Sequence, residues 1–339
     1  MTTILDVAKR AGVAPITVSR VINNSGYISQ KTRYRVEQAI SELGYVPNAL
    51  ARGLRSKRTN TLALVMTDIT NPFFTNIARG VEDTASESGF SVIFCNTDES
   101  ETEEFKYAKI LAQKKVDGIL LVPACSQSRT VEFLKSIDIP VVLLDRRIPD
   151  VQIDTVRCDS IAGAYELVQL LIGLGHKHIT VISGQRGVST AEDRVVGYHQ
   201  AMTEAGLEEN EQVYFGSFTQ ASGYEFTKQA LALNTPPTAF LGANNFITIG
   251  VMKALRDQKL RVPEDVTLVG FDDLPLSLFI DEPFLTVAVQ PAYEMGKKAT
   301  ELLLNRLLGE EPEECQEVIL PIEIIQRKSS GPARCETKG

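Results

Sequence analysis

Apolar residues recur at helical spacing along the first forty-five residues. The pattern predicts three short helices over residues 4–11, 15–23 and 30–43, with Gly12 ending the first and Gly44 just after the third. Two helices joined by a tight glycine turn within about 20 residues are typical of a helix-turn-helix unit. The residues expected to face its core are Ile4, Val7, Ala8, Ala11, Val18, Val21, Ile22, Val36, Ala39, Ile40 and Leu43.

From residue 61 onward the pattern changes to short apolar segments of strand length that alternate with amphipathic helical segments. This alternation predicts parallel, doubly wound sheets covered by helices. The strands are too many for one sheet, so two Rossmann-like lobes fit better. Strands are expected at 62–66, 91–95, 118–123, 140–145, 178–183, 213–218, 238–243, 266–270, 284–289 and 318–325, and helices at 73–88, 101–115, 129–136, 161–174, 191–205, 222–232, 245–258 and 291–308.

A linker separates the two patterns. It begins at Pro47, contains Gly53 and ends in a polar, basic run. A segment this short does not hold a helix by itself in water, so it would become helical only when something holds it. The expected organisation is a helix-turn-helix head at 1–46, the linker at 47–60, a first lobe at 61–158 and 290–318, a second lobe at 159–289 and 319–330, and a tail at 331–339.

The head and the body carry opposite charge. Residues 1–60 hold ten lysines and arginines against three acids, whereas the whole chain has a formal net charge of −8. A basic head on an acidic body indicates that the head meets a polyanion. A solvated, lysine-rich terminus is the alternative, but disordered tails lack the apolar periodicity of this head.

Composition and motif content argue against several classes of protein. Hydrophobic residues make up 43% of the chain, enough for sizeable cores, but no apolar run approaches the roughly 20 residues of a membrane helix. Charged residues near the start disfavour a secretion signal, so we expect a cytoplasmic, nucleoid-associated protein without a membrane partner. Five widely spaced cysteines predict reduced thiols, and no metal site or cofactor is expected. GxSxG and GxGxxG motifs are missing, which argues against an enzyme.

Several motifs of the head resemble the lactose-repressor (LacI) family of bacterial transcription regulators. They are Leu5-Asp6-Val7-Ala8, Ala11-Gly12-Val13, Thr17-Val18-Ser19-Arg20-Val21-Ile22-Asn23, Leu43-Gly44-Tyr45-Val46-Pro47-Asn48 and Ala51-Arg52-Gly53-Leu54. The body is similar to the periplasmic sugar-binding-protein fold, so the resemblance covers nearly the whole chain. It implies a three-helix head with a hinge helix, followed by a two-lobed, periplasmic-binding-protein-like α/β body of doubly wound parallel sheets.

The second predicted helix is the expected DNA-reading element. In helix-turn-helix units this helix lies in the major groove and its N-terminal residues reach base edges, here Pro15, Ile16 and Arg20. Arg20 suits a guanine O6/N7 pair and Ile16 a thymine methyl, although a solvated surface role is the alternative for Arg20. Ala14 stands where the family often has a capping serine. Phosphate anchors are expected at Thr17, Ser19, Asn23 and Thr32, and the resemblance adds Tyr27 as a loop contact to DNA.

The resemblance also assigns a role to the linker. It implies that residues 48–56 form a hinge helix that folds when two copies pair in the minor groove. Leu54 would then be the wedge that kinks the duplex, Ala51 would let the two hinges approach, and Arg55 would add a DNA contact. The alternative is a flexible tether in which Leu54 is exposed by chance.

Polar residues stand at the ends of the predicted strands of the body. In two-lobed α/β proteins the ligand lies at the carboxyl ends of the strands. Carboxylates, amides and arginines beside two phenylalanines suit a small polyol, because they pair with vicinal hydroxyls while the rings cover C–H groups. The expected effector-binding residues are Asn71, Phe73, Phe74, Asp145, Arg146, Arg194, Asn244, Asp272 and Gln290.

The same set resembles the pocket of periplasmic ribose-binding proteins, and the body is similar to bacterial ribose repressors. Ribose or a related furanose is therefore the expected ligand. Asn245 departs from the family, in which aspartate is usual at that position. The alternatives are Asp145 and Asp272 as helix caps, Asn71 as a helix start, Phe73 and Phe74 as core residues, and Arg194 paired on the surface with Asp193 or Glu192.

Together these observations predict a homodimeric transcription repressor that binds double-stranded, roughly palindromic operator DNA and answers to a small sugar between its lobes. The tail lacks leucine heptads, so a dimer is expected rather than a tetramer. One alternative is a regulator with another effector, such as a different sugar, a sugar phosphate, a purine or a phosphoprotein corepressor. The others are a transport-type sugar-binding protein and a sugar-modifying enzyme. The basic head argues against the first, and the lack of an acid/base constellation in the sequence argues against the second.

Overall fold

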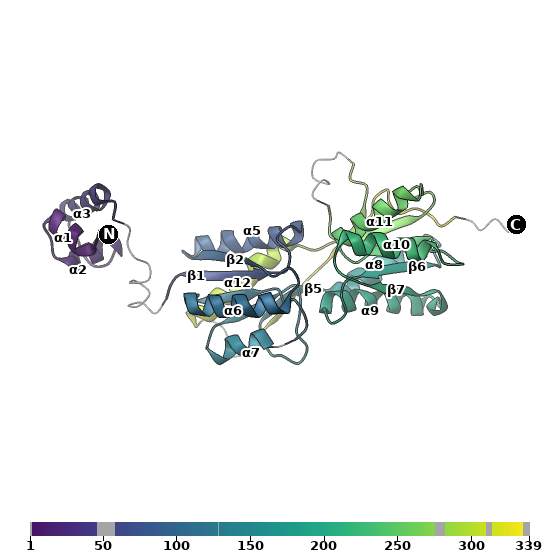
Figure 1. Cartoon of the computed structure of the whole chain (residues 1–339), viewed down its shortest axis with the longest axis horizontal. Helices are drawn as coiled ribbons and strands as arrows, with labels where there is room; N and C mark the ends of the chain where they lie inside the picture. Colours follow the sequence, from purple (N-terminus) through teal and green to yellow (C-terminus); the bar gives the residue numbers. More distant parts are fainter. Residues whose placement is uncertain (1, 46–57, 128, 275–281, 310–313, 335–339) are drawn as a thin grey trace. The chain divides into compact units, whose positions relative to one another are not determined.

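The chain divides into a helical head, Met1–Thr59, and an α/β body, Asn60–Gly339 (Figure 1). The computed structural model describes residues 2–45, 58–127, 129–274, 282–309 and 314–334. The expected hinge helix, with Ala51, Leu54 and Arg55, lies outside the described residues, and so do Val46 and the end of the tail.

The head consists of the three predicted helices, α1 (Ile4–Ala11), α2 (Pro15–Ile22) and α3 (Gln30–Leu43). Their ends follow local chemistry, because Gly12 and Gly44 adopt the left-handed conformation that ends α1 and α3. Val7, Val18 and Val36 are fully buried and hold the three helices around one small core. Helix α2 begins at Pro15, and the residue before it, Ala14, provides no side-chain cap, as expected.

Arg35 uses its positive charge inside the head. Its guanidinium donates hydrogen bonds to the carbonyl oxygens of Ala11, 3.1 Å from Nε, and of Gly12, 2.9 Å from Nη2. These carbonyls lie at the end of α1, where helix carbonyls lack a partner within the helix. Arg35 therefore fixes the turn between α1 and α2 and is less available to a polyanion than the sequence suggests.

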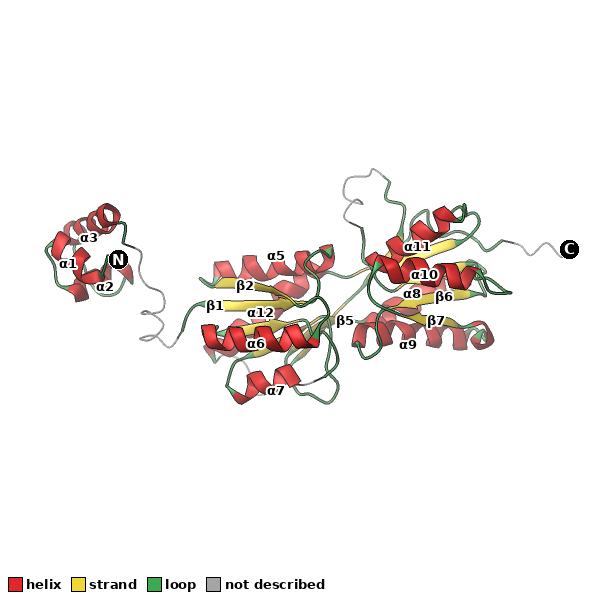
Figure 2. Cartoon of the chain, in the orientation of Figure 1, coloured by secondary structure: helices red, strands yellow, loops and turns green. Residues whose placement is uncertain are grey.

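The first lobe contains a six-stranded parallel sheet in the order β11-β5-β4-β3-β1-β2. Helices α5 and α12 cover one face and α6 and α7 the other, so a separate apolar core lies on each side (Figure 2). The elements are β1 (Thr61–Met66), α5 (Pro72–Glu87), β2 (Ser91–Asn96), α6 (Glu101–Lys114), β3 (Gly118–Leu121), α7 (Arg129–Ser136), β4 (Val141–Leu144), β5 (Thr155–Cys158), α12 (Ala292–Leu308) and β11 (Glu317–Leu320).

The second lobe repeats this plan with a sheet in the order β12-β10-β9-β8-β6-β7. Helices α8 and α9 pack on one face, and α10 and α11 on the other. The elements are α8 (Ser160–Gly173), β6 (Ile179–Ser183), α9 (Ser189–Glu204), the 3-10 helix η1 (Glu208–Asn210), β7 (Gln212–Phe215), α10 (Gln220–Leu231), β8 (Ala239–Gly242), α11 (Asn245–Asp257), β9 (Thr267–Phe271), β10 (Thr286–Val289) and β12 (Glu323–Ile325).

The two-lobed fold class is confirmed, with differences at the ends of the sheets. Strand β5 and η1 were not expected, and the single strand expected at 318–325 is two strands in different sheets. Pro321 follows β11 and lacks the N–H that a continued ladder would need. Strand β12 then runs antiparallel to β10, so the second sheet adds one antiparallel pair to the expected parallel arrangement. The chain thus passes between the lobes three times, after β5, β10 and β11.

Glycines allow the paired helices that cover the sheets to pack with their backbones in contact. A Cβ atom placed on Gly296 of α12 would lie 2.2 Å from the carbonyl oxygen of Ile77 in α5, and one on Gly80 of α5 would lie 2.1 Å from that of Tyr293. The pair α10–α11 has the same reciprocal contact, at Gly223 and Gly250. Backbone-to-backbone contact of this kind leaves no room for a methyl group.

No helix in the described ranges is both long enough and apolar enough to cross a lipid bilayer.

Gly296→Ala should destabilise the body, because the closely packed helices α5 and α12 must move apart to admit the methyl group. We expect a loss of about 1–3 kcal/mol in the free energy of unfolding, measured by urea denaturation. Gly173→Ala in α8 is the matched control, since a Cβ atom there meets nothing within 4 Å. Equal stability of the two variants would contradict the close-packing argument.

Candidate functional site

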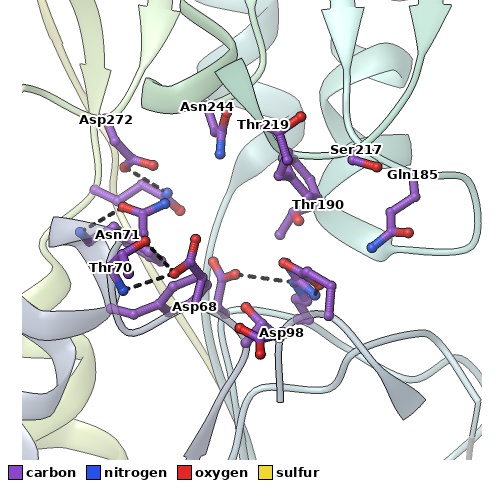
Figure 3. Close-up of a pocket in the computed structure, with 18 of the residues that line it drawn as sticks. Asp68, Thr70, Asn71, Asp98, Gln185, Thr190, Ser217, Thr219, Asn244 and Asp272 are labelled. Carbon is purple, nitrogen blue, oxygen red and sulfur yellow. Dashed lines mark hydrogen bonds and ion pairs between the residues drawn. The ribbon is translucent and has the colours of Figure 1, made fainter. Parts of the chain in front are cut away.

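A cavity of about 490 Å³ lies at the carboxyl ends of the strands, between the two lobes of the body. The labelled side chains of Figure 3 reach it from both lobes, with Asp68, Thr70, Asn71 and Asp98 on one side and Asn244, Thr219 and Gln185 on the other. All nine residues predicted to bind an effector line this cavity, namely Asn71, Phe73, Phe74, Asp145, Arg146, Arg194, Asn244, Asp272 and Gln290.

Asn71 has two structural tasks beside its place in the cavity. Its Oδ1 accepts a hydrogen bond of 3.0 Å from the backbone N–H of Phe73 and thereby caps α5, so Asn71 does start a helix, as the alternative interpretation stated. The same oxygen accepts a hydrogen bond of 2.8 Å from Nδ2 of Asn245 in the second lobe. The amide at position 245 therefore ties the lobes together through a donor that an aspartate would not have.

Phe73 and Phe74 belong to the core and to the cavity wall at once. Their rings meet edge to face with centroids 5.1 Å apart, and both are buried in the core on the α5 side of the first sheet. Asn244, on the opposite side, caps α11 by accepting from the backbone N–H of Ile247 at 2.8 Å. These contacts fix the wall before any ligand arrives.

Asp145 and Asp272 occupy equivalent places, directly after β4 and β9, and are both buried. Both have positive φ angles, 65° and 62°, which are unusual for residues with a side chain and often accompany functional sites. Neither caps a helix in the described ranges, so that alternative was wrong. Gln290 donates a hydrogen bond of 2.9 Å from Nε2 to Oδ1 of Asp272.

Arg146 is held by a partner that the sequence analysis missed. Its two terminal nitrogens donate to the two carboxylate oxygens of Glu99 at 2.6 and 2.7 Å, and Nη1 also donates to the carbonyl oxygen of Pro123 at 2.9 Å. The guanidinium lies 5.4 Å from the ring centroid of Phe218. A fork-to-fork pair of this kind orients Arg146 strongly.

Arg194 points inward and does not pair on the surface. It donates from Nη1 to the carbonyl oxygen of Ala243 and stacks over the ring of Phe271, 4.1 Å from its centroid. The surface alternatives are wrong because Asp193 pairs with Arg147 at 2.5 Å, while Glu192 accepts from the backbone N–H of Gly187 at 2.9 Å. The contact between Arg147 and Asp193 also joins the first lobe to the second.

Burial controls the ionisation of this group of charges. It raises the pKa of Asp145 to about 6, although Arg146 and Arg194 act in the opposite direction. Burial likewise raises the pKa of Asp272, against the lowering effect of Arg194. Burial lowers the pKa of Arg194, and the carboxylates of Asp272 and Asp145 partly offset this lowering.

Several polar atoms of the lining are buried without a hydrogen-bond partner, although Arg146 Nε lies 3.7 Å from Asp145 Oδ2. Such atoms are rare in folded proteins and point to a missing water or ligand. Both lobes supply them, from carboxylate, amide, hydroxyl and guanidinium groups. Among the described residues they are Thr67 Oγ1, Asp145 Oδ1, Arg146 Nε, Arg194 Nε and Gln290 Oε1.

The cavity also includes residues that were not predicted. Phe218 ends the segment expected as a strand at 213–218, and Asp98 and Glu99 follow β2, so the strand-end rule applied to every strand would have found them. The same rule covers Thr67 and Asp68, which follow β1. The others lie in loops or at the start of α9, where no sequence pattern marks them, and they are Thr70, Gln185, Thr190, Ser217 and Thr219.

In the head, the predicted base-reading residues are accessible. Pro15, Ile16 and Arg20 are exposed on α2. The predicted phosphate anchor Asn23 is exposed next to α2, and the predicted loop contact Tyr27 is 94% exposed. The hydroxyl groups among the predicted phosphate anchors are partly engaged. Ser19 Oγ accepts from Asn23 Nδ2 at 3.3 Å, Thr32 Oγ1 lies 2.9 Å from Ser29 Oγ, and Thr17 is half-buried.

Asp145→Asn should change how stability depends on pH. Asp145 holds its proton more tightly in the folded chain than in the unfolded chain, where an aspartate has its ordinary pKa of 3.8. Its stabilising contribution is therefore complete below about pH 4 and lost as the pH rises through about 6. The neutral amide avoids this loss, so D145N should exceed the wild type in free energy of unfolding by up to about 3 kcal/mol above pH 7, with the difference closing toward pH 4.

Urea denaturation of the ligand-free protein between pH 4 and 8 measures that difference. Asp150→Asn, in the exposed loop after β4, is the matched control for a lost carboxylate. A difference between D145N and wild type that does not vary with pH would contradict the assignment of a buried, costly charge to Asp145.

Comparison with known proteins identifies the family of both the head and the body. Residues 3–48 match the family described as "Bacterial regulatory proteins, lacI family", and residues 59–328 match "Periplasmic binding proteins and sugar binding domain of LacI family". The chain is 38% identical to the HTH-type transcriptional regulator DegA of Bacillus subtilis, with 98% of each chain covered. It is 36% identical to the ribose operon repressor of Halalkalibacterium halodurans, with 97% of each covered.

Among solved structures, the lac repressor dimer bound to operator and the anti-inducer ONPF superposes with a TM-score of 0.86, at 27% identity over 97% of this chain and 99% of that one. The similar identities to DegA and to the ribose repressor do not single out one branch, so the likeness to ribose repressors stays at the level of the family. The chain belongs to the LacI family of DNA-binding transcription regulators, with an effector-binding body of the periplasmic-binding-protein type.

Proposed function

We propose that this regulator is a homodimeric repressor whose operator affinity is controlled by a small sugar, ribose or a related furanose, bound in the cavity between the lobes. The observation that carries the proposal is the set of buried polar atoms that lack a hydrogen-bond partner, contributed by Thr67, Asp145, Arg146, Arg194 and Gln290. A polyol supplies donors and acceptors for all of them on one compact frame.

The chemistry of the wall supports a sugar over an apolar ligand. Asp145 and Asp272 accept hydrogen bonds from hydroxyl groups, and Arg194 offers Nε to a ring or hydroxyl oxygen. Phe73 and Phe74 present apolar surface to the C–H groups of a sugar ring. The identity of the sugar rests on the match of residue types to ribose-binding pockets, and the similarity to a ribose operon repressor is compatible with it.

Ligand control of DNA binding follows from where the polar groups lie. Asp145 and Arg146 belong to the first lobe, and Arg194, Asn244 and Asp272 to the second, so one ligand contacts both. A ligand that binds one relative pose of the lobes more tightly shifts the population toward that pose. The linkage acts equally for induction and for corepression, because only the pose that favours DNA differs.

On the DNA side, two copies present two α2 helices to the half-sites of a roughly palindromic operator. Pro15, Ile16 and Arg20 read bases, and Thr17, Ser19, Asn23, Tyr27 and Thr32 hold the backbone. The linker residues Ala51, Leu54 and Arg55 contact the minor groove between the half-sites. Operator DNA, a sugar and a second copy of the chain are thus the proposed partners, in the cytoplasm and at the nucleoid.

Asp272→Ala should abolish sugar binding while operator binding persists. The substitution removes an acceptor from the cavity and leaves Gln290 Nε2 without its partner. We expect the rise in melting temperature caused by 10 mM D-ribose, about 3–8 °C for a ligand well above its Kd, to vanish in D272A.

Glu208→Ala, at an exposed position of η1, is the control and should keep the full shift. Screening fructose, allose, gluconate, purines and sugar phosphates in the same assay tests the other effectors. A ribose-induced shift that survives in D272A would place the sugar elsewhere.

Arg20→Ala should weaken binding to an operator selected by the protein from random DNA. Loss of a bidentate contact to guanine costs about 1–3 kcal/mol per base pair, so we expect at least a tenfold higher Kd and relaxed preference at one base pair in each half-site. Wild-type affinity should also fall steeply with salt.

The control is Arg10→Ala on α1, which removes the same charge from a residue paired with Glu42. Fluorescence anisotropy over 50–200 mM salt measures all three proteins. Equal losses for R20A and R10A would indicate that Arg20 acts only through its charge.

A further inference from the structure

Acids outnumber bases in the lining of the cavity. Five carboxylates face two guanidiniums, and the acids are contributed by four different strand ends. Such a cavity carries a negative potential before any ligand enters, and the low-dielectric walls strengthen it. The lining carboxylates are Asp68, Asp98, Glu99, Asp145 and Asp272, and the guanidiniums are Arg146 and Arg194.

Glu99 makes one of the two guanidiniums, that of Arg146, largely unavailable to a ligand. It engages both terminal nitrogens of Arg146, whose side chain is only 4% exposed, while Pro123 takes a further N–H of Nη1. An anionic ligand group needs the same fork of donors that Glu99 occupies. Arg146 consequently offers little beyond its Nε to a ligand.

The loop that carries Glu99 is built to hold it there. Asp98 and Glu99 both have positive φ angles, 50° and 57°, in two successive residues with side chains. Asn96 secures the loop, because its Nδ2 donates to Asp98 Oδ1 at 2.7 Å while its Oδ1 accepts from the backbone N–H of Ile69 at 2.7 Å. Strained backbone maintained by its surroundings is typical of positions with a functional constraint.

The second guanidinium does not compensate for this loss. Arg194 lies within the influence of both Asp145 and Asp272, and these two carboxylates oppose the lowering of its pKa by burial. Asp68 and Asp98 add negative charge on the side of the cavity opposite Asn244 and Thr219 (Figure 3). A phosphate or carboxylate group on a ligand would meet carboxylates on both lobes.

We propose that Glu99, by occupying the guanidinium of Arg146, makes this cavity selective for uncharged sugars and rejects their phosphorylated or carboxylated forms. The proposal rests on the sugar-binding function above and names the class of effector. The regulator then senses a free sugar, which is the substrate of a phosphorylating reaction and not its product.

The test compares two ligands of nearly the same shape. D-ribose and D-riburonate, its C5 carboxylate, differ by one oxidised carbon and one negative charge, so the ratio of their Kd values reports charge selection. Isothermal titration calorimetry on the full-length protein should give a Kd for riburonate at least 100-fold above that for ribose. In Glu99→Gln, which releases Arg146 from its ion pair, we expect this ratio to fall at least tenfold.

Glu103→Gln is the matched control. Glu103 lies on α6 four residues after Glu99, pairs with Lys106 at the surface and does not line the cavity. The same substitution there should leave the ratio unchanged. Asp98→Asn is the second test variant, because Asp98 is exposed and an amide oxygen can still accept from Asn96. It should reduce the ratio about threefold, and it decides the matter if E99Q does not fold.

Each outcome bears on a different step. Equal affinity of the wild type for the two ligands overturns charge selection while the sugar-binding function stands. If E99Q folds and its ratio of Kd values equals that of the wild type, the proposed role of these carboxylates is overturned. If E99Q does not fold, an unchanged ratio in D98N overturns it. If the wild type binds neither ligand, the proposed sugar function fails and this inference fails with it.

Discussion

The burial of opposed charges at the carboxyl ends of two sheets is the constraint on which this body depends. Asp145 and Asp272 directly follow equivalent strands, and both are buried in the lining that they share with Arg146 and Arg194. Burial raises the pKa of both carboxylates, and the nearby arginines act in the opposite direction. A ligand that supplies hydrogen bonds to these buried carboxylates and guanidiniums stabilises the folded body, so ligand binding is part of the energetics of the fold.

The two lobes meet at this cluster through a small number of polar contacts. Asn245 bonds to Asn71 at one place, and Arg147 bonds to Ser189 and Asp193 at another. The lobes are internally rigid, because glycine contacts such as those of Gly80 bring their helices to van der Waals distance. Two rigid bodies joined by three chain crossings and a few hydrogen bonds can change their relative pose at low cost, and this pose is what the proposed ligand would shift.

In the head, charge and geometry divide the basic residues into two kinds. Arg35 holds the turn between α1 and α2 and Arg10 pairs with Glu42, whereas Arg20 lies exposed on the face of α2. The net charge of the head therefore overstates the number of cations available to DNA. The same distinction applies in the cavity, where Glu99 occupies the guanidinium of Arg146.

The sequence by itself determined the helices of the head, the two-lobed α/β body and the nine predicted cavity residues, because each depends on a local pattern. Helical spacing, strand–helix alternation and polar residues at strand ends can all be read along the chain. Even the dual role of Asn71 as helix cap and cavity residue was within reach, since both follow from its place after β1.

Only the tertiary structure decided which charges are paired and which are free. Glu99 meets Arg146 across 47 positions of chain, Asn245 meets Asn71 across 174, and β11 and β12 separate into different sheets on either side of Pro321. Side-chain pairing at such separations depends on how the strands are ordered in the sheets and on how the lobes meet. No local pattern of apolar and polar residues encodes that order, so the chemistry of the cavity became visible only in three dimensions.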